Sequence, residues 1–185
     1  MTDIQTFEPE GRAIPYVVEG EGPVPLVLIA EPGQDALGVV GHYLAEEAGF
    51  HIIRIGYGPG ERSLDERADD VMAVIDHLGL DHTWIGGHGF GGTVARTTVA
   101  AHPDRANGLL LLGVEDVDIP LPPVIPVLIV QATDDAVTPV ANAEALQATA
   151  PERATIRSVA GAGHLFPLTH IMDTAVFIEE YLDWD

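Results

Sequence analysis

Short apolar runs alternate with segments of helical periodicity along almost the whole chain, and this alternation limits the possible folds more than any other feature. Runs such as LVLIA and VLIVQA are apolar at nearly every position, as is typical of strands that helices cover on both faces of a parallel sheet. The alternation predicts an α/β protein with a doubly wound, mostly parallel sheet of about eight strands flanked by helices. An antiparallel hairpin is expected at the N-terminal edge of that sheet.

The spacing of apolar residues, together with capping and turn signals, places the individual elements. Strands are expected at Ala13 to Val18, Val24 to Ala30, His51 to Tyr57, Thr83 to Gly87, Gly108 to Val114, Pro126 to Ala132 and Ala154 to Val159. Helices are expected at about residues 35–48, 64–78, 90–102, 139–149 and 171–183. The second helix has the clearest start, because Ser63 and Glu66 form a capping-box pattern. A length of 185 residues predicts one domain over residues 1–185.

The composition excludes several classes of function. The absence of cysteine removes disulfides, thiolate metal sites and thiol nucleophiles together. Eight basic residues, all arginine, stand against 29 Asp+Glu, for a formal net charge of −21, and such a surface repels nucleic acid and anionic lipid. The sequence also has no pattern of a signal peptide or a membrane-spanning segment. We therefore expect a cytoplasmic protein with no nucleic-acid or membrane partner.

Three motifs occur in order, each at the end of an expected strand. They are GHGFGG at residues 87–92, ATDDAVTP at residues 132–139, which contains Asp135, and AGAGHLFP at residues 160–167, which contains His164. This ordered set resembles the α/β-hydrolase superfamily over nearly the whole chain, where a nucleophile elbow, an acid and a histidine follow the fifth, seventh and eighth strands. The resemblance implies that Asp135, or less favourably Asp134, orients His164 as a general base.

The elbow departs from the family pattern at one position. The family has G-H-S-x-G-G where this chain has GHGFGG, so Gly89 stands in place of the nucleophile, while His88 keeps a position whose role is mostly structural. Ser63 and Ser158 are expected in a helix cap and a strand, and Thr93 is expected to pack or to bond a backbone carbonyl. A covalent serine mechanism needs an oxygen at the elbow and is therefore improbable for this chain.

The loop IAEPG, residues 29–33, aligns with the other half of the family's anion pocket. The resemblance implies that the backbone N–H groups of Glu31 and Phe90 form an oxyanion hole. Haloalkane dehalogenases have a similar Glu-Pro pair here, but they need a carboxylate at the elbow, which Gly89 does not supply. Two interpretations of the Glu31 side chain stay open: an acid, base or hydrogen-bonding group in the pocket, or a solvated loop residue.

The connection between the sixth and seventh expected strands is short. It consists of EDVDIPLPPVI, residues 115–125, whereas many members of the superfamily insert a helical cap there. No cap domain is expected, so the pocket should be shallow, open, or closed by a second subunit in a homodimer.

These residues favour a protein that acts on a small organic molecule through a His164–Asp135 general-base dyad and an oxyanion hole, with no metal and no cofactor. Two alternatives remain. The chain could be a pseudo-hydrolase that binds a small apolar ligand in the space left at Gly89. It could also be an interaction protein, as neuroligins are, which resemble esterases and lack the nucleophile.

Overall fold

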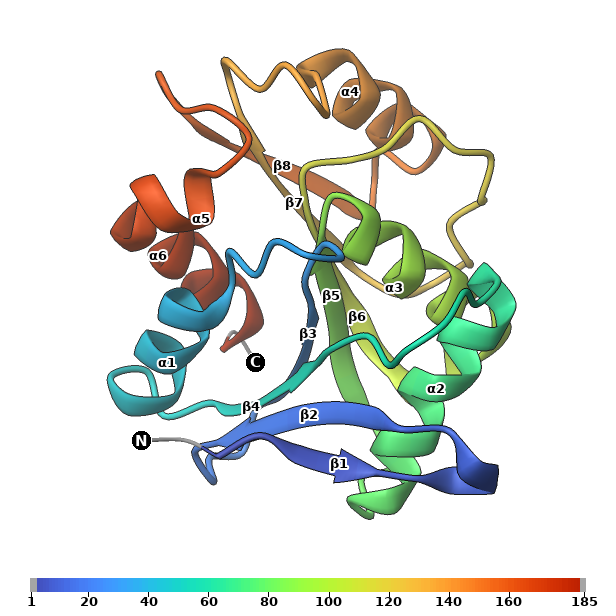
Figure 1. Ribbon diagram of the computed structural model, residues 1–185. Coiled ribbons are helices and arrows are strands. Elements are labelled where there is room, and N and C mark those ends of the chain that lie inside the picture. The colour runs from blue at the N-terminus through green and yellow to red at the C-terminus, as the bar shows by residue number, and fades with distance from the viewer. Residues whose placement is uncertain (1–2, 184–185) are drawn as a thin grey trace.

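Residues 3–183, which the computed structural model describes, form a central sheet of eight strands in the order β1-β2-β4-β3-β5-β6-β7-β8 (Figure 1). The strands are β1 (Gln5–Phe7), β2 (Ile14–Glu19), β3 (Pro25–Ile29), β4 (His51–Ile55), β5 (Thr83–His88), β6 (Ala106–Leu112), β7 (Val127–Ala132) and β8 (Ala154–Val159). Strands β4, β3, β5, β6, β7 and β8 pair in parallel. β2 pairs antiparallel with both β1 and β4, so the predicted N-terminal hairpin is confirmed.

All seven strands placed from the sequence are present, with ends that differ by at most two residues. The strand that the sequence did not place is β1, the three-residue segment QTF. It is too short to have a recognisable alternation, and its residues are mostly exposed. The predicted fold class, a doubly wound and mostly parallel sheet between helices, is confirmed.

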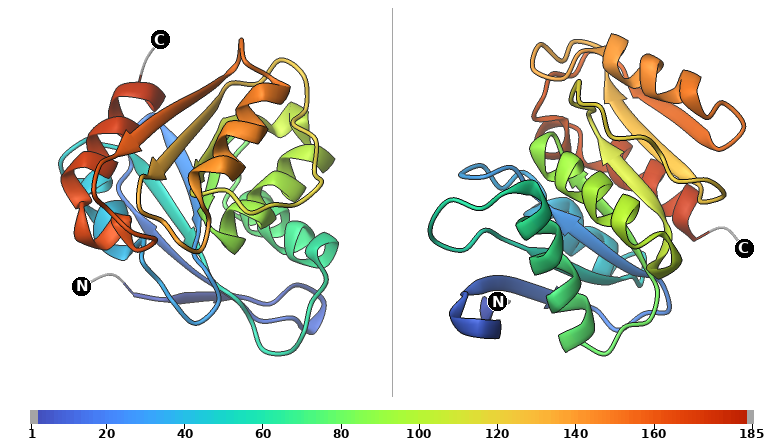
Figure 2. Two further views of the ribbon diagram at one scale, coloured as in Figure 1. Left: turned by 90° about the horizontal axis from the view of Figure 1, so that it is seen from above. Right: turned by 90° about the vertical axis from the view of Figure 1, so that its right-hand side faces the viewer.

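Helices cover both faces of the sheet (Figures 1 and 2). They are α1 (Gly38–Glu46), α2 (Leu64–His77), α3 (Phe90–Ala101), α4 (Val140–Thr149), α5 (Phe166–Thr169) and α6 (Ile171–Leu182), with 3-10 turns at Pro9–Gly11 and Pro103–Arg105. α1 and α6 lie on one face, and α2, α3 and α4 lie on the other. None of the helices in residues 3–183 combines the length and the hydrophobicity that crossing a bilayer requires.

Local signals explain where two of these helices begin. At α2, the Ser63 hydroxyl accepts the Glu66 N–H and the Glu66 carboxylate accepts the Ser63 N–H, which is the predicted capping box. α1 begins three residues later than predicted, because the Asp35 side chain accepts the Leu37 N–H at 2.9 Å and holds a turn before the helix. The second serine of the chain, Ser158, lies in β8, as expected.

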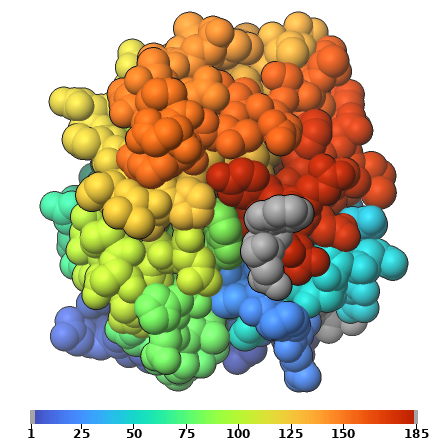
Figure 3. Space-filling view, turned by 180° about the vertical axis from the view of Figure 1, so that it is seen from behind, coloured from blue at the N-terminus to red at the C-terminus, as the bar shows by residue number. Residues whose placement is uncertain are grey.

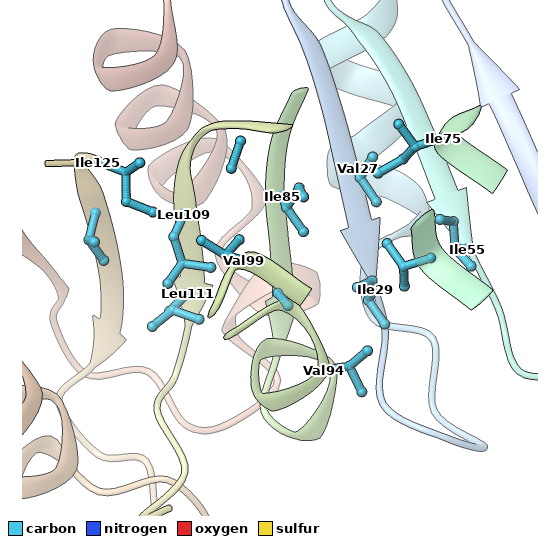
Figure 4. Packing of buried hydrophobic residues seen from close by; sticks show 14 of the residues in the cluster. Val27, Ile29, Ile55, Ile75, Ile85, Val94, Val99, Leu109, Leu111 and Ile125 are labelled. Carbon is cyan, nitrogen blue, oxygen red and sulfur yellow. The ribbon is translucent and has the colours of Figure 1, made fainter. Parts of the chain in front are cut away.

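The core has two halves, because successive side chains of a strand point to opposite faces of the sheet. In β3, Val27 and Ile29 face α2 and α3, and Figure 4 shows them among Ile85, Leu109 and other apolar side chains. The alternate residues of the same strands pack against α1 and α6. The side chains of both halves are almost fully buried, and each large aliphatic one stabilises the fold by about 1.5–3 kcal/mol.

The carboxyl ends of the parallel strands share one edge of the sheet, where the loops after β3, β5, β7 and β8 meet. Residues 113–126, which connect β6 to β7, contain no helix or strand, so no cap separates that edge from solvent. Seen from behind, the C-terminal third of the chain, in orange and red, fills most of the upper half of the surface (Figure 3).

Candidate active site

The elbow turn lies between β5 and α3. β5 ends at His88 and α3 begins at Phe90, so Gly89 alone makes the turn, with φ 56° and ψ −115°. Glycine adopts such a positive φ without steric cost. At the next turn position, a Cβ atom on Gly91 would lie 1.9 Å from the carbonyl oxygen of Ile29. Glycine at position 91 therefore allows the start of α3 to pack directly against the end of β3, which brings the loop after β3 to the elbow.

The Glu31 carboxylate occupies the space beside Gly89. A Cβ atom built on Gly89 would lie 2.6 Å from Glu31 Oε2 and 2.7 Å from Glu31 Cδ. The backbone of Glu31 is held in a tight turn, where its carbonyl accepts the Gln34 N–H at 3.1 Å. The side chain of a residue on β3's loop thus fills the volume that a nucleophile on the elbow would occupy. The space expected to be vacant at Gly89 is filled.

Asp135 and His164 are in contact. His164 Nδ1 donates to Asp135 Oδ2 at 2.9 Å. The same carboxylate accepts the Val137 and Thr138 N–H groups at 2.9 and 2.8 Å and the Thr138 hydroxyl at 2.7 Å. Burial raises the pKa of Asp135, but these hydrogen bonds more than offset it and leave that pKa below its ordinary value. Asp134 is exposed, so Asp135 is the acid of the pair.

His164 lies between two carboxylates. While Nδ1 faces Asp135, Nε2 lies 2.6 Å from Glu31 Oε1. Burial lowers the pKa of His164, but the hydrogen bonds to Asp135 and Glu31, together with their charges, more than offset it and raise that pKa above its ordinary value. The side chains of Asp135, His164 and Glu31 are 0%, 10% and 18% exposed. The site therefore stabilises an imidazolium that donates one proton to each carboxylate.

The ring of His88 packs against the ring of His164. The two rings stack with their centroids 4.4 Å apart, and the His88 ring also meets the edge of Phe166. His88 Nε2 donates to the carbonyl of His164 at 2.7 Å. Because that nitrogen carries the proton, Nδ1 is the acceptor, and it lies 3.5 Å from Glu31 Oε1 with no hydrogen-bond partner among residues 3–183. Burial lowers the pKa of His88, which keeps it neutral beside the imidazolium.

Glu31, His88 and His164 also form a group with one potential metal-ligand atom each, all within 4.8 Å of one another. Their arrangement suits a shared proton better than an ion. Two ligands of a tetrahedral zinc ion are about 3.3 Å apart, whereas His164 Nε2 and Glu31 Oε1 are 2.6 Å apart. The two rings are only 23° from parallel, so their lone pairs do not converge on one point.

A cavity of about 620 Å³ has Glu31 in its lining, but not Gly89, Phe90 or His164. Its lining combines apolar side chains such as Leu37 and Ile55 with polar groups that include Glu31 and Tyr57. The Tyr57 hydroxyl donates to the carbonyl of Ala30 at 2.6 Å, which fixes the loop after β3 against the loop after β4. The size is that of a small-molecule site.

The order of the motifs along the sequence does not identify the residues that fix the surrounding loops and side chains in place. Thr93 is buried, as the packing alternative predicted, and it donates its hydroxyl to the carboxylate of Glu115 rather than to a backbone carbonyl. Arg96, buried on α3, donates to the carbonyls of Glu115, Val117 and Ile119 and fixes the loop after β6. The sequence signal for Arg96 is a charged residue within an otherwise apolar helix segment. Thr138, next to Pro139, is not among the residues that the sequence motifs identify, although it contacts both Asp135 and His164.

The raised pKa of His164 makes the stability of the fold depend on pH. A histidine whose folded pKa exceeds its unfolded value of about 6.5 stabilises the fold fully below that pH. The free energy of unfolding should therefore fall as pH rises from about 6.5 through the folded pKa, by at most about 1.4 kcal/mol per pH unit. His88, with its lowered pKa, and Asp135 do not change charge in this window. In Glu31→Gln the fall should end at lower pH and be smaller in total, because the folded pKa of His164 loses one of the groups that raise it, whereas the exposed Glu61→Gln should match the wild type. Urea unfolding and the NMR titration of His164 test this, and an unchanged His164 pKa in Glu31→Gln would contradict it.

The chain is similar to known proteins both in sequence and in structure. No protein-family model matches the chain. The dihydrolipoyllysine-residue acetyltransferase component of an acetoin cleaving system from Pseudomonas putida is 30% identical over 118 residues, 59% of this chain and 32% of that protein. RutD of Caulobacter segnis, named provisionally as a carbamate hydrolase, is 37% identical over 55 residues, 30% of this chain and 21% of that protein. The chain thus matches only about a third and a fifth of the length of these relatives.

The structural similarity is much more extensive. An α/β hydrolase from the metagenome of lagoon sediments at Mar Chica, Morocco, superimposes with a TM-score of 0.84 over 98% of both chains, at 18% identity. At this level of identity the similarity establishes the fold. The chain therefore has the α/β-hydrolase fold.

Proposed function

We propose that the chain is an enzyme that acts on a small organic molecule through proton transfer by His164, oriented by Asp135, without a serine nucleophile. The observation that carries the proposal is the 2.6 Å contact of His164 Nε2 with the Glu31 carboxylate, in the place where a nucleophile would stand. Asp135 thus orients His164 through Nδ1, and Nε2 of the same ring faces the Glu31 carboxylate. Titratable groups with shifted pKa values that lie in contact, as His164 and Asp135 do, are typical of catalytic sites.

The proposed roles follow from the hydrogen bonds. Asp135 holds the Nδ1 proton of His164 and stabilises the imidazolium that forms when Nε2 takes a proton from water or substrate. Neutral His164 is the active base, so the rate should rise with pH through the raised pKa of His164. The N–H of Phe90, at the first position of α3, and the N–H of Glu31 are the proposed oxyanion donors.

The cavity beside Glu31 supports a substrate of small size. About 620 Å³ with a mixed apolar and polar lining accommodates a compact organic molecule. A net charge of −21 disfavours anionic substrates. Because a partial relative is named for carbamate hydrolysis, neutral esters and carbamates are the substrates to test first.

The same cavity favours one alternative, a pseudo-hydrolase that binds a small apolar ligand. The ligand would occupy the cavity rather than the position beside Gly89, which Glu31 fills. In that case substitution of His164 would change neither ligand binding nor any slow turnover.

The proposal is tested by the hydrolysis of p-nitrophenyl acetate and a p-nitrophenyl carbamate by the wild type, His164→Ala and His82→Ala. His82 is exposed and provides a matched histidine control. A positioned general base contributes about 10²–10⁴-fold, so His164→Ala should lower kcat/KM by that factor, while His82→Ala should not. Equal rates for all three proteins would refute the proposal.

A further inference from the structure

We propose that Tyr57 is the positioning residue of the oxyanion hole. Its hydroxyl sets the direction of the Glu31 N–H through the carbonyl of Ala30, and its ring packs against Phe90, which carries the other donor. The inference rests on the proposed function, because it assigns a further residue to the same reaction. Tyr57 acts on the rate through the backbone and takes no proton itself.

The fold brings Tyr57 to the loop after β3. Strands β3 and β4 pair in parallel, with Ile29 opposite Ile55. Ala30 and Tyr57 therefore both lie just beyond the carboxyl ends of neighbouring strands, at the edge of the sheet that holds the site. There the Tyr57 hydroxyl donates to the carbonyl oxygen of Ala30 at 2.6 Å.

This hydrogen bond fixes the peptide that carries one oxyanion donor. A trans peptide is planar and directs its C=O and its N–H in opposite directions, and residues 3–183 contain no cis peptide bond. The carbonyl of Ala30 and the N–H of Glu31 belong to one such plane. Both residues have negative φ, so steric exclusion alone leaves the plane several allowed directions. The bond from Tyr57 selects one of them, and it also polarises the peptide so that the N–H becomes a stronger donor.

The ring of Tyr57 makes two further contacts. Its centroid lies 6.4 Å from that of the Phe90 ring, at an interplanar angle of 38°, within the range of aromatic pairs that attract each other. The guanidinium of Arg67, on α2, lies 4.6 Å from the same centroid as a cation–π pair. Burial raises the pKa of Tyr57 and outweighs the charge of Arg67, which lowers it. The hydroxyl therefore stays protonated and remains a donor over the pH range of an assay.

Tyr57 thus contacts both segments that carry the proposed oxyanion donors, the loop after β3 and the start of α3. In Tyr57→Phe the ring contacts remain, but the peptide between Ala30 and Glu31 is free to turn. Complete loss of one donor lowers kcat by about 10²–10³-fold. A donor that is still present but poorly aimed should lower kcat by about tenfold or more, up to that limit, with KM unchanged.

The experiment compares p-nitrophenyl acetate with its thiono analogue, in which sulfur replaces the carbonyl oxygen. Sulfur is a weak hydrogen-bond acceptor, so the ratio of the two kcat/KM values reports how well the donors are aimed, and a loss of folded protein cancels from it. The wild-type ratio should exceed that of the uncatalysed reactions in buffer. Tyr57→Phe should lower the ratio by about tenfold or more. Tyr181→Phe should keep it, because the Tyr181 hydroxyl donates to a backbone carbonyl at the opposite edge of the sheet, that of Val127, at 3.4 Å.

An unchanged ratio in Tyr57→Phe would overturn the inference, as would a wild-type ratio no greater than that in buffer. If Tyr57→Phe does not fold, Arg67→Met decides the matter through the same ratio, which should fall because the ring loses its cation while the hydroxyl is kept. Either overturning result, with hydrolysis that still depends on His164, leaves the proposed function standing without a role for Tyr57. If hydrolysis does not depend on His164, the proposed function fails and this inference fails with it.

Discussion

A serine at position 89 is expected to create an efficient esterase only when the Glu31 side chain is removed at the same time. In Gly89→Ser alone, the new Cβ atom would lie 2.6 Å from Glu31 Oε2, so the serine and the carboxylate compete for one space. Glu31 is flexible enough to move, but it then gives up a charge-assisted hydrogen bond to His164, at about 1.5–3 kcal/mol. That cost lowers, by about tenfold or more, the fraction of molecules in which Glu31 has moved away and the serine hydroxyl can react.

In Gly89→Ser with Glu31→Ala, the hydroxyl can reach His164 Nε2 directly. Adding His164→Ala to this pair should then lower kcat/KM for p-nitrophenyl acetate by about 10²–10⁴-fold, the usual contribution of a positioned base. Both serine variants should also be less stable by about 1–3 kcal/mol, because a residue with a side chain must adopt the positive φ of Gly89. Steady-state kinetics and urea unfolding measure the two effects.

The matched control places a serine elsewhere on the same helix. Ala100 is exposed on α3, so Ala100→Ser with Glu31→Ala adds a hydroxyl without placing it at the elbow. This protein should have no esterase activity above Glu31→Ala. A folded but inert Gly89→Ser, Glu31→Ala protein would mean that the oxyanion donors are out of position, and it would argue for the ligand-binding alternative.

The sequence predicted the fold well because the responsible signals are long and repeated. Fully apolar strands and amphipathic helices recur in a regular order, and each one is supported by its neighbours. β1 and α5 were not predicted because they have only three and four residues, too few for a period of 2 or 3.6 residues to repeat. The start of α1 was misplaced because a single side-chain bond, from the Leu37 N–H to Asp35, decides it.

The candidate site was predictable in part for a geometric reason. Asp135 and His164 follow neighbouring parallel strands, whose carboxyl ends must share an edge, so their proximity follows from the order of the strands. The contact between His164 and Glu31 spans 133 positions and depends on the approach of the β3 loop to the elbow at Gly91. Such a contact is set by side-chain packing, which no motif in the sequence encodes. For the same reason, the sequence left the role of Glu31 open between a pocket group and a solvated residue.

Asp135→Ala should be the most destabilising single substitution in the site. The Asp135 side chain is fully buried and accepts four donors: the Val137 N–H, the Thr138 N–H, the Thr138 hydroxyl and His164 Nδ1. Alanine leaves all four without their partner, and removing one member of a buried charged pair costs about 3–5 kcal/mol. Urea unfolding should show this loss, whereas Asp134→Asn, at the exposed neighbouring position, should stay within about 0.5 kcal/mol of the wild type.

Asp135→Asn separates the structural role of this residue from its role in orienting His164. An asparagine oxygen can still accept the two backbone N–H groups, so most of the stability should remain. Its amide N–H₂ faces His164, however, and favours the tautomer with the proton on Nε2, which is the wrong nitrogen for a base. Activity that depends on His164 should therefore fall by about 10⁴-fold, and nitrogen NMR of the imidazole should detect the changed tautomer. If Asp135→Asn keeps full activity with the new tautomer present, His164 does not act as the base, and Glu31 becomes the group that must take the proton.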